Sequence, residues 1–161
     1  MDTLELALSL EFDLETYYTG QAEKNKENSL FVVFTMLAGE EQKHVDILLG
    51  KADLFDLNVE DENILSEARG LFKKLANFES DIKELPSQLD SYRMALGMEQ
   101  KSLNFYKSLH DTAVDEKTKK TYQYLIKQED IHCTVMEELV KLTTRPEEWV
   151  ESAEFGLRED Y

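Results

Sequence analysis

A pattern of four residues whose side chains can bind metals or donate protons occurs twice in the chain, at a constant offset of 88 positions. The pattern is a glutamate, a tyrosine seven residues later, and a Glu-x-x-His motif that begins 30 residues after the first glutamate. The residues are Glu11, Tyr18, Glu41 and His44 in the first copy, and Glu99, Tyr106, Glu129 and His132 in the second. Four carboxylates and two imidazoles are the donor set that a carboxylate-bridged pair of metal ions requires.

The repeated residues fall on the apolar stripes of four predicted helices, among hydrophobic and aromatic neighbours. The stripes are Leu4, Ala7, Glu11, Leu14 and Tyr18; Phe34, Leu37, Glu41, His44 and Leu48; Tyr92, Ala95, Glu99, Ser102 and Tyr106; and Tyr122, Leu125, Glu129, His132 and Met136. A carboxylate in such a stripe is costly unless a counter-charge compensates it, and two cations compensate all four. We therefore expect removal of the ions to raise the pKa of some of these glutamates, and glutamine at positions 11 and 99 to relieve part of their repulsion.

The spacing also predicts how the helices pair, because residues equidistant from a turn lie level in an antiparallel hairpin. The midpoint of Glu11 and Glu41 is residue 26, inside the polar segment 24–28, and the midpoint of Glu99 and Glu129 is residue 114. Each hairpin therefore brings its own two glutamates level, and packing of the two hairpins can bring all four together. Positions i and i+3 share a helix face, so each Glu-x-x-His directs both side chains inward.

Helical periodicity dominates the chain, which contains only six glycines and two prolines. We expect one all-α domain over residues 1–161, with the connectivity of a ferritin-like four-helix bundle. Its expected parts are a first hairpin (3–50) ending at Gly50, a long crossover with a short helix (51–88), a second hairpin (89–142), and a short C-terminal helix (144–158) that begins at Thr144, Arg145 and Pro146.

Composition excludes several classes of function. The 34 acidic residues outnumber the 18 basic ones, and the net charge of −16 argues against binding to nucleic acids or anionic membranes. Cys133 is the only cysteine, so neither a disulfide within the chain nor a four-cysteine metal site is possible. The N-terminus lacks the features of a signal peptide, and no apolar run reaches the ~20 residues of a membrane span. We expect a cytoplasmic protein.

The chain resembles the rubrerythrin branch of the ferritin-like superfamily over roughly residues 3–142. The residues that carry the resemblance are Leu10 to Tyr18, Leu37 to His44, Met98-Glu99 with Phe105-Tyr106, and Leu125 to His132. The resemblance implies that Glu11, Glu41, His44, Glu99, Glu129 and His132 bind two iron ions, with manganese or zinc as alternatives. It also implies that Tyr18 and Tyr106 donate hydrogen bonds to ligand carboxylates.

Two features depart from the peroxidase members of that family. Those members carry a C-terminal rubredoxin-like domain, which these 161 residues do not contain. They also have an additional glutamate three residues after the third-helix ligand, where this chain has Ser102. Both departures put efficient peroxidase turnover in question and leave the six-ligand set intact.

The favoured interpretation is a di-iron protein that reduces hydrogen peroxide or dioxygen with oxidation of the bound iron. It would need an external electron donor, for which a rubredoxin-type protein is one candidate, and we expect a homodimer. The alternatives are a non-enzymatic iron-handling protein of ferroxidase type, a helical interaction module with a vestigial site, and a metal-free polar network.

For Tyr18 and Tyr106 a purely packing role is an equal alternative. Glu15 and Glu40 lie off the stripes, and we expect them to be solvated.

Overall fold

The computed structural model describes residues 2–51, 64–76 and 85–155, and of residues 85–86 and 145–155 it describes the backbone only. The described elements are α1 (Thr3–Lys24), α2 (Leu30–Leu48), α3 (Ile64–Ala76), the short 3₁₀ helix η3 (Leu85–Gln88), α5 (Leu89–Thr112) and α6 (Glu116–Phe155). Every regular element in these ranges is helical, which confirms the all-α prediction.

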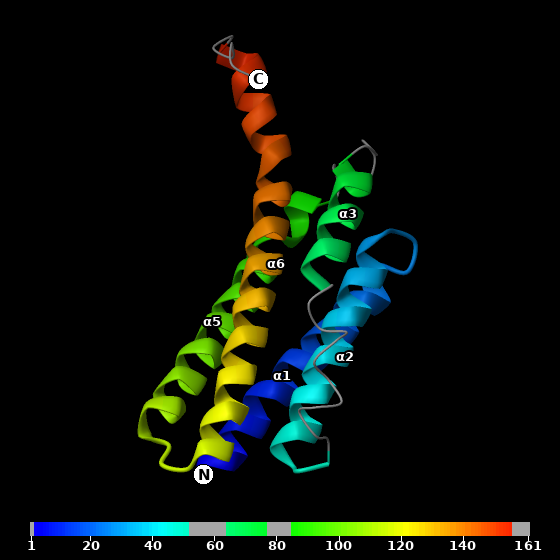
Figure 1. Cartoon of the computed structure of the whole chain (residues 1–161). Helices are drawn as coiled ribbons and strands as arrows, with labels where there is room; N and C mark the ends of the chain where they lie inside the picture. The colour runs from blue at the N-terminus through cyan, green and yellow to red at the C-terminus, as the bar shows by residue number, and fades with distance from the viewer. Residues whose placement is uncertain (1, 52–63, 77–84, 156–161) are drawn as a thin grey trace.

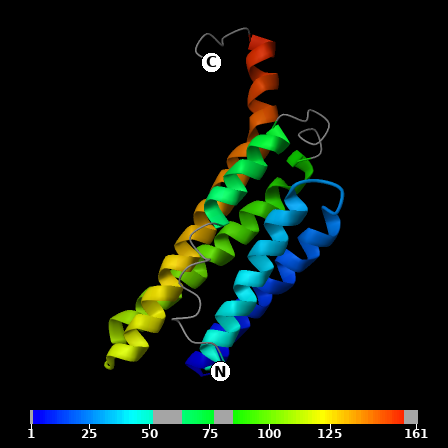
Figure 2. The same ribbon diagram turned by 45° about the vertical axis from the view of Figure 1, so that its right-hand side comes forward.

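Two helical hairpins pack side by side to form the bundle (Figures 1 and 2). α1 lies along α2, and α5 lies along α6. The hairpins meet where α1 packs on α5 and where α2 packs on α6. None of the helices in the described ranges is both long enough and apolar enough to cross a membrane.

Side chains and a glycine fix the ends of the helices. Asp2 accepts a hydrogen bond from the backbone N–H of Glu5 at 2.8 Å and caps α1. After α2, the N–H of Lys51 donates to the carbonyl of Asp46 and the N–H of Gly50 donates to that of Ile47. This pattern is a Schellman motif, and it requires the left-handed conformation that Gly50 adopts at φ 73°. The predicted stop at Gly50 is therefore confirmed.

The predicted short helix of the crossover is α3, which packs against α6 and α2. Its buried residues recur at helical spacing: Ile64, Ala68, Phe72 and Leu75. On its outer side, Arg69 donates to the carboxylate of Glu138 on α6 at 2.9 and 3.0 Å. The remainder of the predicted crossover falls largely on residues 52–63 and 77–84, which lie outside the described residues.

The separate C-terminal helix predicted for residues 144–158 was wrong over the part that can be compared. α6 continues without interruption from Glu116 through Pro146 to Phe155, and residues 156–158 lie outside the described residues. Proline removes one backbone N–H, which here would donate to the carbonyl of Leu142, but its fixed φ of about −65° is compatible with a helix. One lost hydrogen bond did not end the helix, whose last turns project beyond the other helices (Figure 1).

The predicted stripes form the core of the bundle, with one exception. Every stripe residue is buried or partly buried except Leu4, whose side chain is 45% exposed. Leu4 lies in the first turn of α1, at the end of the bundle where the N-terminus is drawn in Figure 1. Periodicity assigns a residue to a face, but it does not show where along that face the neighbouring helix ends.

Candidate metal centre

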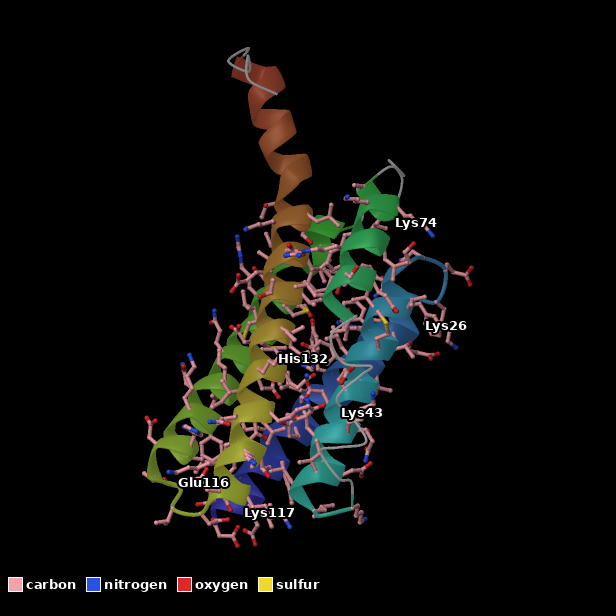
Figure 3. The ribbon with its side chains drawn as sticks, in the orientation of Figure 1. Lys26, Lys43, Lys74, Glu116, Lys117 and His132 are labelled. Atoms are coloured by element: carbon pink, nitrogen blue, oxygen red, sulfur yellow. The ribbon has the colours of Figure 1, made fainter. Side chains whose placement is uncertain are left out.

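All six predicted ligand residues converge in the interior of the bundle, and each has 0% of its surface exposed. They come from four helices: Glu11 from α1, Glu41 and His44 from α2, Glu99 from α5, and Glu129 and His132 from α6. Figure 3 shows His132 about midway along the bundle, far from the end that carries Glu116 and Lys117. The antiparallel pairing predicted from the spacing therefore holds in both hairpins.

The six residues divide into two groups of mutually close donor atoms, within 4.8 Å of one another in each group. One group is Glu11, Glu41, His44 and Glu129, and the other is Glu41, Glu99, Glu129 and His132. Glu41 and Glu129 belong to both groups. This is the arrangement expected for two ions that share two bridging carboxylates, with one further glutamate and one histidine for each ion.

Each histidine directs its Nδ1 atom into the carboxylate cluster. His44 Nδ1 lies 3.1 Å from Glu129, 3.2 Å from Glu11 and 3.5 Å from Glu41. His132 Nδ1 lies 2.9 Å from Glu41 on the opposite hairpin. The histidine of each hairpin thus contacts a bridging glutamate of the other, so neither hairpin forms the site alone.

The two repeated tyrosines connect the hairpins in the same reciprocal way. Tyr18 on α1 donates to Glu99 on α5 at 2.6 Å, and Tyr106 on α5 donates to Glu11 on α1 at 2.6 Å. Both hydroxyls are fully buried. Burial and the charge of the acceptor glutamate raise the pKa of each phenol, so the hydroxyl keeps its proton and remains a donor.

In the metal-free protein the pKa values of the two shared glutamates, Glu41 and Glu129, are raised. Burial, followed by the charges of Glu11 and Glu99, raises the pKa of Glu41 well above its usual range. Burial and the charge of Glu41 do the same for the pKa of Glu129. The expectation that some of these glutamates have raised pKa values is therefore supported.

The other two glutamates behave in the opposite way. Burial opposes ionisation of Glu11, but the adjacent charge of His44 outweighs it and lowers the pKa of Glu11 to about 2. The same partner effect raises the pKa of His44 to about 10, against burial. His132 likewise lowers the pKa of Glu99, and Glu99 raises that of His132. Glutamine at positions 11 and 99 would therefore remove the carboxylates whose pKa values His44 and His132 lower, which argues against the expectation that this double substitution relieves repulsion.

The unpaired atoms of the cluster fit a pair of cations. Glu41, Glu99 and Glu129 each have a buried Oε2 atom without a hydrogen-bond partner among the described residues. Unpartnered buried oxygens are costly, and coordination to a cation removes that cost. Glutamate oxygen with imidazole nitrogen is a donor set suited to iron, manganese or zinc.

One buried carboxylate was assigned wrongly from the sequence. Glu40 was expected to be solvated, but only 7% of its surface is exposed. It forms a further group of donor atoms within 4.8 Å with His44 and His132. The signal in the sequence was its position four residues before His44, since residues i and i+4 are neighbours on a helix surface. Glu15 is half-buried, not fully solvated.

The family model described as Rubrerythrin matches residues 2–140. The chain belongs to the rubrerythrin family. Searches of curated proteins and of solved structures each returned no match.

Membership of the rubrerythrin family accounts for the bundle and its duplicated inner residues, and it also defines what differs here. Ser102, which replaces the additional glutamate, is fully buried on α5 and its Oγ atom has no hydrogen-bond partner among the described residues. Cys133, next to His132, is buried, and burial raises the pKa of its thiol to about 12. It is not a member of any of the donor groups found among the described residues.

Proposed function

We propose that this protein is a di-iron oxidoreductase that reduces hydrogen peroxide, or dioxygen, with oxidation of the bound iron. The observation that carries the proposal is the pair of overlapping donor groups with Glu41 and Glu129 in common. A purely structural polar network would not need four buried glutamates around two histidines, because buried carboxylates are destabilising without compensation.

Each of the two ions would be held by one histidine, one unshared glutamate and the two shared glutamates. The set for one ion is Glu11 and His44, and the set for the other is Glu99 and His132, each completed by Glu41 and Glu129. When bound, a ferrous pair supplies two electrons to the oxidant. Reduction of hydrogen peroxide to two water molecules consumes these electrons and two protons, and an external electron-donor protein must then restore the reduced state.

The remaining residues would position the ligands and exclude solvent. Tyr18 and Tyr106 hold one oxygen of Glu99 and of Glu11, and so leave the other oxygen of each carboxylate for a cation. Because burial raises the pKa of both phenols, we assign these tyrosines a positioning role and take water as the source of protons.

Ser102 favours a second candidate, in which the same site oxidises ferrous iron as part of iron storage or supply. A serine at this position provides no fifth carboxylate for the site. In this alternative the iron is the substrate and leaves the site after oxidation.

The test is anaerobic loading of the metal-free protein with two ferrous ions per chain, followed by rapid mixing with hydrogen peroxide. The absorbance of ferric iron is then recorded for wild type, for Glu41→Ala, and for Asp130→Ala as a control next to a proposed ligand but exposed. We expect wild type and Asp130→Ala to oxidise faster than free ferrous ion, and Glu41→Ala to lose this advantage. Equal rates for all three proteins would contradict the proposal.

The fate of the oxidised iron separates the two candidates. In an oxidoreductase both ferric ions stay bound, and added reductant restores the ferrous protein through repeated cycles. In an iron-handling protein, ferric iron leaves the site, and further ferrous ions are oxidised without a reductant. Ser102→Glu should increase peroxide turnover only if the first interpretation is correct.

A further inference from the structure

The geometry points to Glu40 as the residue that holds both ligand histidines in place, by accepting the hydrogen bonds of their outward-facing Nε2–H groups. The inference rests on the proposed function, because it concerns the histidines in their metal-bound form. Its starting observation is that the Nε2 atom of His44 and that of His132 are buried without a hydrogen-bond partner among the described residues.

Metal binding fixes the protons on both rings. The Nδ1 atom of each histidine faces the carboxylate cluster, so Nδ1 is the atom available to an ion there. A neutral imidazole has one N–H, and when Nδ1 binds a metal that hydrogen is on Nε2. Both Nε2–H groups then lie in a buried place and need acceptors.

Glu40 is positioned to provide these acceptors. Its carboxylate lies within 4.8 Å of a ring nitrogen of His44 and of His132. The donor group that contains Glu40 includes neither of the shared glutamates and neither of the unshared ones, so Glu40 flanks the histidines and not the carboxylate cluster. Its charge also contributes to the raised pKa of His132. A movement of at most about 2 Å brings an oxygen to the ~2.8 Å of a charge-assisted hydrogen bond.

The orientation of the two rings favours a hydrogen-bonded carboxylate over a third metal ion at this place. The ring planes are inclined by only 18°, with centroids 5.4 Å apart. An imidazole binds a metal in the plane of its ring, and two nearly parallel planes several ångströms apart share no point close to both rings. A carboxylate has two oxygens with about four acceptor sites, and it can serve one ring with each oxygen while keeping other contacts.

The histidines come from different hairpins, so a single carboxylate that contacts both has a further consequence. Glu40 and His44 lie on α2, whereas His132 lies on α6. Loss of Glu40 should therefore loosen both ions and not only the one next to its own helix. Removal of an acceptor from a ligand histidine typically weakens metal binding by about 10–100-fold.

The test compares Glu40→Ala and Glu40→Gln with the control Asp130→Ala. Asp130 follows Glu129 as Glu40 precedes Glu41, but its side chain is exposed, so the control removes one charge at the same chain distance from a ligand. Titration with Co²⁺ measures affinity through the visible absorption of the bound ion. Nitrogen-15 NMR of the Zn²⁺-loaded proteins reports the Nε2–H groups and their exchange with water.

We expect Glu40→Ala to bind Co²⁺ about 10–100-fold more weakly than wild type, with faster exchange of the Nε2–H protons of both histidines. Glu40→Gln, which keeps one acceptor oxygen and matches the shape, should recover part of the affinity, and it serves as the variant if the alanine substitution impairs folding. Affinity and exchange equal to those of Asp130→Ala would overturn the inference while the metal site stands. Absence of Co²⁺ binding by wild type would overturn the proposed function first, and the inference with it.

Discussion

The two hairpins of this bundle are alike where they face the candidate metal centre and differ in the residues just behind it. Positions separated by 88 residues carry the same three donor residues in each half, two glutamates and one histidine, and the same tyrosine. One layer further out, Glu40 of the first hairpin corresponds to Gln128 of the second, and Leu14 corresponds to Ser102. All four of these residues are buried. Two ions in a shared site demand equal ligands from each half, whereas the surrounding layer is free to adjust each half separately.

We expect the largest effect on metal binding from the comparison of a glutamate shared by both donor groups with a glutamate that belongs to one group. Glu41→Ala removes a carboxylate that belongs to both donor groups, and Glu11→Ala removes one that belongs to a single group. We expect Glu41→Ala to lose both ions, with affinity reduced by more than about 100-fold, and Glu11→Ala to retain one. The measurement is metal content after desalting. Retention of one tightly bound ion by both variants would mean that Glu41 does not bridge.

A second comparison concerns stability without metal. Because the pKa of Glu41 and that of Glu129 are raised in the folded state, both groups destabilise the metal-free protein increasingly as pH rises above 4.5. Glu41→Gln with Glu129→Gln removes this cost, so the metal-free double variant should melt higher than wild type. Glu11→Gln with Glu99→Gln removes the carboxylates whose pKa values His44 and His132 lower, so this double variant should melt lower. A difference of about 1 kcal/mol shifts the thermal midpoint of a chain of this size by about 2–4 °C.

The pH dependence of the thermal midpoint tests separately whether the raised pKa values of Glu41 and Glu129 destabilise the metal-free protein. Below pH 4.5 the shared glutamates are protonated in the unfolded state as well, so the advantage of Glu41→Gln with Glu129→Gln should vanish there. It should grow as pH rises above 4.5. Midpoints recorded in chelator at pH 4 and pH 7 test this, and an advantage that is equal at both values would show that the two carboxyls are ionised in the fold.

The two repeated tyrosines should contribute equally to stability, because their hydroxyl groups make equivalent hydrogen bonds in the two halves. Tyr18→Phe and Tyr106→Phe each remove one buried hydroxyl that donates to a charged carboxylate at 2.6 Å. We expect each to lower the free energy of unfolding of the metal-free protein by about 1.5–3 kcal/mol. Denaturant unfolding of both variants measures the two values. Values that differ more than twofold would indicate that one tyrosine only packs.

The smallest effect should come from Ser102, where the halves differ. Its hydroxyl is buried without a hydrogen-bond partner among the described residues, so Ser102→Ala should stabilise the protein by about 1 kcal/mol. Chemical denaturation in chelator measures this change. A loss of stability would show that the hydroxyl has a partner, such as a buried water molecule, in solution.

Much of the site could be predicted from the sequence because its geometry follows from helix periodicity and hairpin length. Glu11 and Glu41 are level because they are equidistant from one turn, and the 88-residue repeat extends this to Glu99 and Glu129. Glu40 escaped prediction because a position beside the main stripe is buried only where other elements cover it. The continuation of α6 through Pro146 escaped because proline weakens a helix without always ending it. The protonation of each glutamate depends on distances to His44 and His132, which spacing alone does not provide.

The central claim is that six buried side chains hold two ions between the hairpins, and crystallography of the iron-loaded protein at the iron absorption edge tests it most directly. The account predicts two anomalous peaks, one among Glu11, Glu41, His44 and Glu129, and one among Glu41, Glu99, Glu129 and His132. It further predicts that Glu41 and Glu129 contact both peaks. A single peak, or iron bound only to acidic residues on the surface, would contradict the account.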